Sequence, residues 1–354
     1  MKVIKVEAPA RICFFGDHQD YLNLPVIAGT INRYIHIEGE PINQKTFNIQ
    51  LLDIKEFITI NLDEKYRNIK NEDYFFSVIE VLKKAGYSFS QGYRIKISGT
   101  IPINAGLSSS SALVVAWIRF LLATQEKEKF VTDEQIGRWA YEAEVSYFNQ
   151  SGGLMDQYTI AQKGLLYIDT LKGKTEPLKA NLGSLVIAES GLSKQTQSVL
   201  QNARKYGQAA ISAVLDKVPK FNIHEADETD YKEYLNFVPE LYQDHWYAAI
   251  FNHLLTKKAR EMMKSDLIDF GKLGSWMNSH QKILQERIQN TPNVMQEQMN
   301  AALNSGALGT KIIGSGGGGC MVAMVNEENK EKVIQAFINK GAKAAYEINL
   351  ITPI

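Results

Sequence analysis

This chain of 354 residues has only two cysteines and no surplus of charge of either sign. The two cysteines, Cys13 and Cys320, lie far apart and outside any CxxC or Cys/His spacing, so neither a disulfide framework nor a zinc site is indicated. We expect two buried, reduced thiols. Lysine plus arginine (39) equals aspartate plus glutamate (39), and this balance argues against nucleic acid or an anionic membrane as a partner. A small anionic ligand at one local site remains possible.

Long apolar runs are missing as well. The most apolar helical stretch, 112–123, is interrupted by Arg119 and is far too short to span a bilayer, and the N-terminal residues have no apolar signal-peptide core. These features predict a cytoplasmic protein. Hydrophobic residues make up 45% and charged residues 22%, which excludes a disordered chain, a collagen and a coiled coil. The length suggests two domains.

The hydrophobic pattern predicts a mixed α+β protein in two parts, with domains 1–180 and 181–354. The first part begins strand-rich, and the acidic stretch near residue 228 is expected to be a solvated loop or surface helix. Strands are expected at 2–8, 33–40, 47–53, 57–63, 93–99, 164–170, 184–190, 310–315, 320–325 and 344–351. Helices are expected at 72–86, 112–125, 133–148, 197–216, 246–304 and 329–340.

The segment NAGLSSSSA (104–112) puts a glycine turn and four serines directly before an apolar helix. Helix N-termini carry unpaired N–H groups and a partial positive charge, so they attract phosphate, and serine hydroxyls can bind Mg²⁺. The alternative is a serine N-cap on a core helix. As a phosphate loop, the segment offers the ATP-binding candidates Gly106, Leu107, Ser108, Ser109, Ser110 and Ser111.

Two other phosphate-loop patterns have no support. No GxxxxGK[ST] occurs, which argues against a P-loop NTPase. Residues 314–319 match GxGxxG literally, but the run leads from one strand into another, whereas a dinucleotide fingerprint must open a helix. This run therefore predicts a tight loop that allows another backbone or a ligand to approach closely.

Three segments together resemble the GHMP kinases: APARICFFGDHQDYLNLPVIAGTINRYI (8–35), NAGLSSSSA (104–112) and KIIGSGGGGC (311–320). Two more are similar to the galactokinase branch of that superfamily, GLMDQYTIAQKGLLYID (153–169) and MNSHQKILQERI (277–288). The resemblance implies a ribosomal S5 domain 2-like N-terminal domain, a ferredoxin-like C-terminal domain and an active site in the cleft between them. It also implies an ATP- and Mg²⁺-dependent kinase, most simply one that phosphorylates the anomeric hydroxyl of a sugar.

The resemblance also assigns roles to residues of this sequence. Asp156 matches the carboxylate that faces the acceptor hydroxyl as catalytic base, and Arg11 matches the cation beside it. A carboxylate can take the hydroxyl proton, and a fixed cation would offset charge on the transferred phosphoryl group. Ser110 and Glu144 are the implied Mg²⁺ ligands, and Ser111 and Glu142 are their nearby alternatives.

GDHQDY supplies Asp17, His18 and Asp20 as implied substrate contacts, and Gly153 matches a glycine that approaches the sugar. Carboxylates and an imidazole suit a polyol because they pair with vicinal hydroxyls. Asp17 stands where the galactokinase pattern has Glu, one methylene longer, so the sugar need not be galactose. A heptose phosphate, a uronic acid or a mevalonate-type alcohol is the alternative acceptor, and a catalytically inactive sugar and ATP sensor is a further one. The oligomeric state, monomer or dimer, stays open.

Overall fold

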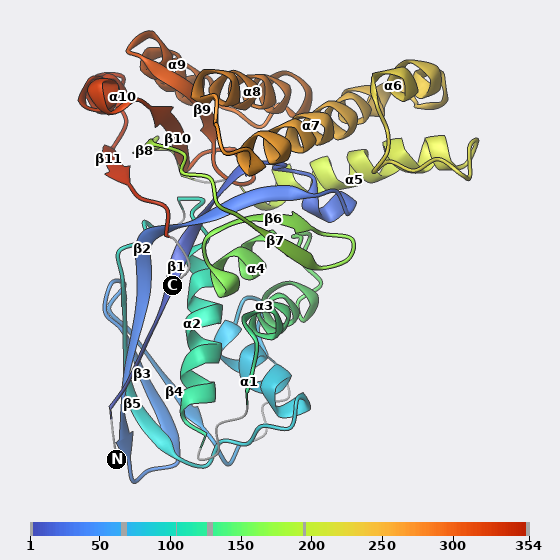
Figure 1. Ribbon diagram of the computed structural model, residues 1–354. Coiled ribbons are helices and arrows are strands. Elements are labelled where there is room, and N and C mark those ends of the chain that lie inside the picture. Colours follow the sequence, from blue (N-terminus) through green and yellow to red (C-terminus); the bar gives the residue numbers. More distant parts are fainter. Residues whose placement is uncertain (1–2, 65–68, 104, 126–129, 194–195, 352–354) are drawn as a thin grey trace. The chain divides into compact units, whose positions relative to one another are not determined.

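The computed structural model describes residues 3–64, 69–103, 105–125, 130–193 and 196–351 (Figure 1). It divides into two compact units, and the chain passes between them more than once. Unit 1 comprises Met1–Arg11, Thr30–Ile103 and Ser108–Lys163, and unit 2 comprises Ile12–Gly29, Asn104–Leu107 and Gly164–Ile354. The predicted domain boundary near residue 180 stays a prediction.

Unit 1 is a sheet with helices on one face. Its strands lie in the order β4 (Glu56–Asn61), β3 (Thr46–Leu51), β5 (Gly92–Gly99) and β2 (Val26–Ile42), and β1 (Ile4–Phe15) also pairs with β2. All neighbouring pairs among β4, β3, β5 and β2 are antiparallel except β3 with β5. The helical segments are α1 (Tyr74–Lys84), α2 (Ser109–Ala123), α3 (Asp133–Tyr141), the π-helical turn η2 (Glu142–Ser146) and α4 (Met155–Gln162).

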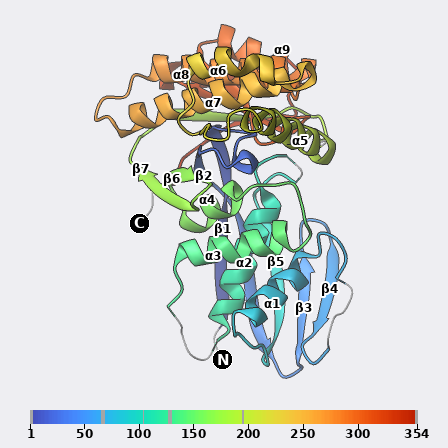
Figure 2. The same ribbon diagram turned by 90° about the vertical axis from the view of Figure 1, so that its right-hand side faces the viewer.

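Helix α2 is the buried centre of unit 1, and it lies with α1 and α3 over the sheet in both views (Figures 1 and 2). Its Trp117 is almost fully buried and meets Phe47 of β3 edge to face, at 5.5 Å between ring centroids. A Cβ on Gly39 of β2 would lie 2.4 Å from the Phe120 ring, so the glycine lets α2 approach the sheet closely. Helix α2 begins at Ser109, within the serine run that the sequence predicts to bind phosphate.

The C-terminal part of unit 2 is an antiparallel sheet covered by helices. Its strand order is β11 (Ala344–Ile348), β8 (Ser184–Glu189), β10 (Cys320–Val325) and β9 (Ala307–Ile312). Helices α9 (Asn293–Asn304) and α10 (Lys330–Asn339) contribute Met295, Met299 and Phe337 to its core. The sheet places the loop between β9 and β10, residues 313–319, at one end of two buried strands.

Unit 2 also contains further helical segments. They are η1 (Asp20–Leu22), α5 (Thr196–Leu215), α6 (Glu228–Tyr234), η3 (Leu235–Phe237), α7 (Glu240–Lys264), α8 (Phe270–Ile283), the π-helical turn η4 (Leu284–Ile288) and η5 (Glu327–Asn329). Strands β6 (Leu165–Asp169) and β7 (Lys174–Leu178) pair with each other, and β6 pairs with the start of β2. Tyr21 and Leu22 pack with Ala203 of α5 and Ala249 of α7, so η1 rests on a small apolar core.

The α+β fold class is confirmed, with several differences in detail. The predicted helical run 246–304 is broken into α7, α8 and α9, at 265–269 and at 289–292. The acidic stretch forms the surface helix α6, and both cysteines are free and buried, as expected. No helix in the described ranges is long and apolar enough to cross a membrane, while the cytoplasmic location stays a prediction.

Candidate active site

In unit 1, Arg11 and Asp156 form a two-pronged ion pair. Arg11 Nε lies 2.5 Å from Asp156 Oδ1 and Nη2 lies 2.8 Å from Oδ2. The Arg11 side chain is 4% exposed, whereas that of Asp156, in the first turn of α4, is 25% exposed. The guanidinium therefore fixes the orientation of a carboxylate that solvent, and hence a small molecule, can still reach.

Ser108 connects this pair to the start of α2. Its hydroxyl donates to Asp156 Oδ2 at 2.5 Å, and its backbone has the left-handed conformation, with φ at +58°. Although Ser108 is the N-cap residue of α2, its side chain makes no capping hydrogen bond. The simple N-cap explanation of the serine run thus does not hold for Ser108, and its side chain leaves the N–H groups of the first turn of α2 uncapped.

Glu144 is the second carboxylate of unit 1, and it lies in the π-helical turn η2. Its side chain is almost fully buried, accepts a hydrogen bond from Gln157 Nε2 at 2.8 Å and is within hydrogen-bonding reach of the Ser110 and Ser111 hydroxyls. Burial raises the pKa of Glu144, and these hydrogen bonds oppose the rise only in part. Glu142, by contrast, is exposed. A buried carboxylate facing two hydroxyl oxygens is a ligand set that suits a hard cation.

Among the described residues, no group of three or more His, Cys, Asp and Glu side chains could hold a metal ion. Glu144 and Asp156 are only two such side chains. They do interact, because the negative charge of Asp156 contributes to the raised pKa of Glu144. Mg²⁺ in phosphoryl-transfer sites is commonly held by one or two carboxylates, the remaining ligands being waters and substrate phosphates. The residues therefore fit a metal that arrives with a nucleotide.

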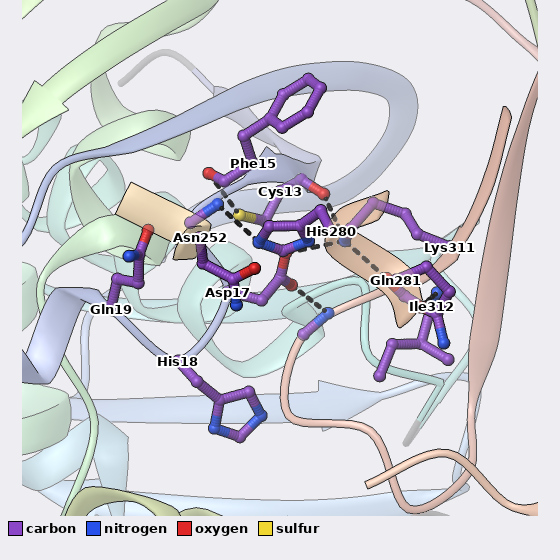
Figure 3. A network of polar contacts seen from close by, with 12 residues as sticks. Cys13, Phe15, Asp17, His18, Gln19, Asn252, His280, Gln281, Lys311 and Ile312 are labelled. Carbon is purple, nitrogen blue, oxygen red and sulfur yellow. Dashed lines mark hydrogen bonds and ion pairs between the residues drawn. The ribbon is translucent and has the colours of Figure 1, made fainter. Parts of the chain in front are cut away.

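In unit 2, Asp17 lies in a buried network of polar groups drawn in Figure 3. Its Oδ2 lies 2.7 Å from Lys311 Nζ and its Oδ1 accepts the Gly314 N–H at 3.1 Å, while both charged side chains are at most 1% exposed. Burial is the largest single effect and would raise the pKa of Asp17, but the charge of Lys311, the influence of His280 and hydrogen bonds from Lys311 and Cys13 together hold the pKa below the ordinary value. Asp17 is therefore an ionised carboxylate with both oxygens engaged inside unit 2.

His18 and Asp20 follow at the turn before η1. The His18 backbone is left-handed, with φ at +63°, and its ring is held by the Tyr21 hydroxyl at Nδ1 (2.8 Å) and by the Ser315 carbonyl at Nε2 (3.0 Å). Asp20 is half-buried and its Oδ1 accepts the Tyr21 N–H. The motif is thus a rigid turn whose shape depends on the glycine-rich loop.

That loop, residues 314–319, also contacts the phosphate-loop residue Ala105 within unit 2. The Cys320 N–H donates to the Ala105 carbonyl at 2.8 Å, and a Cβ on Gly319 would lie 2.7 Å from the same oxygen. At the other end, a Cβ on Gly316 would lie 2.4 Å from the Asn290 carbonyl. Close approach of three backbones explains the glycine run that the sequence predicted to be a tight loop.

The structure thus gathers the sequence-predicted residues into two groups, one in each unit. Unit 1 holds Arg11, Ser108, Ser109, Ser110, Ser111, Glu144, Gly153 and Asp156, and unit 2 holds Asp17, His18, Asp20, Gly106 and Leu107. Sequence reasoning missed Lys311, His280 and Gln157. Lys311 left one signal, a single charge inside an otherwise apolar strand, while His280 and Gln157 lie within segments already quoted for the resemblance.

Two family models match this sequence. The model of the GHMP kinases N terminal domain matches residues 73–164, and the model of the GHMP kinases C terminal matches residues 259–343. The chain belongs to the GHMP kinase family. The two-domain GHMP kinase fold that the resemblance implied is thereby confirmed.

The relatives of this GHMP kinase include proteins with two different names. The mevalonate kinase of Thermococcus gammatolerans is 27% identical over 361 residues, covering 99% of this chain and 97% of that protein. The galactokinase of Lacticaseibacillus casei is 28% identical over 342 residues, covering 92% of this chain and 86% of that protein. At such similar levels of identity, neither name decides the acceptor.

Solved structures show the same fold. The crystal structure of Lactococcus lactis galactokinase complexed with galactose matches with a TM-score of 0.85 at 20% identity, covering 99% of this chain and 94% of that one. The Methanococcus jannaschii mevalonate kinase matches with a TM-score of 0.74 at 19% identity, covering 99% of both chains. Together with the family models, these findings make the protein a member of a family of sugar and alcohol kinases.

Proposed function

We propose that this GHMP kinase transfers the γ-phosphoryl group of ATP to the anomeric hydroxyl of a sugar. The observation that carries the proposal is the Arg11–Asp156 pair, because it holds a partly exposed carboxylate in one fixed orientation. The oxygen of the acceptor hydroxyl attacks the γ-phosphorus, and Asp156 accepts the proton of that hydroxyl. The bond from the γ-phosphorus to the β-phosphate oxygen breaks, and ADP leaves. Arg11 keeps Asp156 ionised and offsets the charge that develops on the transferred group.

The start of α2 provides the phosphate-binding part of the site in this proposal. The N–H groups of the first turn of α2 and the hydroxyls of Ser109 and Ser110 are donors for phosphate oxygens, and the helix dipole favours negative charge there. Gly106 and Leu107 complete the loop, and the left-handed backbone of Gly106, with φ at +88°, requires a residue without a side chain.

Glu144 and the Ser110 or Ser111 hydroxyl would hold Mg²⁺ together with the nucleotide phosphates. The raised pKa of Glu144 supports this role. The hydrogen bonds to this buried carboxylate offset only part of the cost of its charge, so a bound cation would stabilise the ionised form. A metal bound there would supply positive charge that offsets the charge of the nucleotide phosphates. Gln157, which donates to Glu144, would fix the direction of the ligating oxygen.

A neutral polyol is the acceptor that the charges near the motif support best. The charge of the fully buried Lys311 is paired with Asp17, and the charge of Arg11 is paired with Asp156, so neither cation is offered to an anionic acceptor. Arg204 of α5, whose charge acts on the Tyr21 hydroxyl, is the cation that could favour an anionic acceptor instead. His18, Asp20 and Gly153 are the proposed sugar contacts.

A mevalonate-type alcohol is the second candidate, because relatives of equal identity are named mevalonate kinases. Its carboxylate would need a cation, and Arg204 is the residue to supply it. An inactive sensor is the weakest alternative, because the phosphate-loop serines and Asp156 are all present.

A substrate screen with ADP release as the readout tests the proposal. The panel contains neutral hexoses, uronic acids, heptose phosphates and mevalonate, each with MgATP. Turnover of a neutral hexose, with a 1-phosphate product identified by NMR, is the expected result. Turnover of mevalonate alone, or of no compound, would show the sugar 1-kinase proposal to be wrong, and loss of mevalonate turnover in Arg204→Met would assign the carboxylate contact.

A further inference from the structure

The Asp17–Lys311 pair is unlike the ion pairs on the surface of unit 2. Lys311 is 0% exposed and Asp17 is 1% exposed, whereas Lys330 and Glu347 in a comparable pair are 14% and 39% exposed. Lys311 Nζ also donates to the carbonyls of Cys13 at 2.9 Å and of Ile312 at 2.6 Å, so the ammonium group has three oxygen partners. One buried ammonium group therefore joins the end of β1, the GDHQDY motif and the end of β9 (Figure 3).

The motif and the glycine-rich loop are joined at two successive residues. Asp17 accepts the N–H of Gly314, and His18 contacts the carbonyl of Ser315. From the other side, His280 of α8 accepts the Gly16 N–H at Nε2, 3.1 Å away. Each contact fixes backbone rather than filling space, so the network determines the path of residues 16–18 and the placement of the His18 ring.

Stability alone does not explain a buried ion pair. Removing two charges from water costs free energy that their attraction rarely exceeds, and apolar side chains of similar volume often stabilise a core equally well. An ion pair instead restricts geometry, because an ammonium group with three oxygen partners tolerates little displacement of any of them.

We propose that Lys311 and Asp17 are positioning residues of the acceptor site, which fix the turn at residues 16–20 and thereby the side chains of His18 and Asp20. Asp17 then acts through the backbone and through the neighbouring His18, without touching the acceptor. This inference rests on the proposed function in one respect, namely that the acceptor binds at His18 and Asp20.

The experiment compares Lys311→Met, the double variant D17N/K311M and the control Lys330→Met. The control removes a cation of the same kind from unit 2, at a place remote in sequence from the motif. The double variant leaves no lone buried charge, so it keeps the test valid if Lys311→Met fails to fold. The two readouts are hydrogen–deuterium exchange of peptides covering 14–22 and 310–320, with 46–61 as the reference, and steady-state kinetics with acceptor and ATP varied separately.

We expect faster exchange in peptides 14–22 and 310–320 of D17N/K311M, with the reference peptide and the control variant unchanged. We also expect a rise in the acceptor KM of about 10- to 100-fold, the scale on which small displacements of a positioned group act, with the ATP KM within about twofold. Wild-type exchange in both peptides, acceleration spread evenly over the chain, or an unchanged acceptor KM would overturn the inference. If the wild type turns over no compound of the panel, the proposed function fails, and the exchange data decide the positioning role alone.

Discussion

Arg11 and Asp156 face each other with two guanidinium nitrogens on the two carboxylate oxygens, at 2.5 and 2.8 Å. Such bidentate, charge-assisted pairs are stronger and more directional than a single ion pair. The burial is unequal, 4% exposed for Arg11 against 25% for Asp156, so the arginine serves as a fixed support for the exposed carboxylate. That asymmetry is what a general base needs, since the base must meet its substrate and its partner must not move.

Asp156→Asn should therefore lower kcat by about 10²- to 10⁴-fold, the range expected when general-base catalysis is lost. The ATP dissociation constant should change little, because we propose that the phosphates bind at the start of α2. Calorimetric titration with a non-hydrolysable ATP analogue, beside a coupled turnover assay, measures both. Asp133→Asn, which removes the exposed partner of Arg119 in the same unit, is the control and should keep near wild-type activity. Near wild-type activity in Asp156→Asn itself would show the base assignment to be wrong.

Glu144→Gln should separate activity from stability. Because burial raises the pKa of Glu144, its ionised form is costly in the fold, and the neutral amide should leave the free energy of unfolding unchanged or higher. Activity should fall by about 10-fold or more and should require more Mg²⁺, as a metal ligand is lost. Glu142→Gln, in the same turn but exposed, should show neither change. A Mg²⁺ titration of turnover and a thermal melt measure the two effects, and equal Mg²⁺ dependence in both variants would contradict the assignment.

The strands and helices could be predicted where the apolar pattern was strong, as in the helical spacing over 72–86 and the uninterrupted apolar run over 320–325. The break of the run 246–304 into α7, α8 and α9 was not predicted, because the helical pattern resumes after 265–269 and again after 289–292. Strand β7 contains Pro177, a residue that argues against a strand unless it lies at an edge, and β7 is the last strand on its side of the sheet. Helix α4 was missed because GLMDQY was interpreted only as a motif.

The candidate site was predictable as a set of residue types and not as a set of contacts. The sequence pattern predicted Asp17 to be a substrate contact, whereas we propose above that it positions the turn without touching the acceptor. No pattern could indicate that Lys311, 294 positions away, engages its carboxylate. Such pairings depend on how β9 is aligned with the end of β1. A pairing between residues so far apart in sequence can be recognised only when the positions of both elements in the fold are known.

Gly319→Ala should weaken ATP binding. The φ of Gly319 is +87°, and an added Cβ would lie 2.7 Å from the Ala105 carbonyl, so the phosphate-loop backbone must shift. Gly341→Ala is a matched control, since its φ is +85° and nothing lies within 4 Å of the added atom. Both variants carry the same backbone strain, of order 1 kcal/mol, and Gly319→Ala should lose more stability because its Cβ also meets the Ala105 carbonyl. Only Gly319→Ala should raise the ATP KM, and equal KM values in the two variants would contradict a role of this contact in shaping the phosphate loop.

His280 should make the protein less stable as the pH falls below 6.5. Burial disfavours the imidazolium and lowers its pKa to about 3, an effect that Asp17 opposes in part and that Lys311 and His18 reinforce. Between pH 6.5 and about 3 the unfolded chain binds a proton that the folded protein does not. The free energy of unfolding therefore decreases as the pH is lowered. The slope is about 1.4 kcal/mol per pH unit for each such histidine, and His253, whose pKa is lowered to about 4, adds a second term.

His280→Gln removes one of these two protons and keeps an oxygen that can accept the Gly16 N–H. Urea unfolding of the wild type and of His280→Gln from pH 4.5 to 6.5 should therefore give a shallower slope for the variant, by about 1.4 kcal/mol per pH unit where the unfolded histidine is fully protonated. The raised pKa of Glu144 acts in the opposite sense in both proteins and cancels in the comparison. Parallel curves for His280→Gln would mean that His280 carries its proton in the fold, and then its Nε2 could not accept from Gly16.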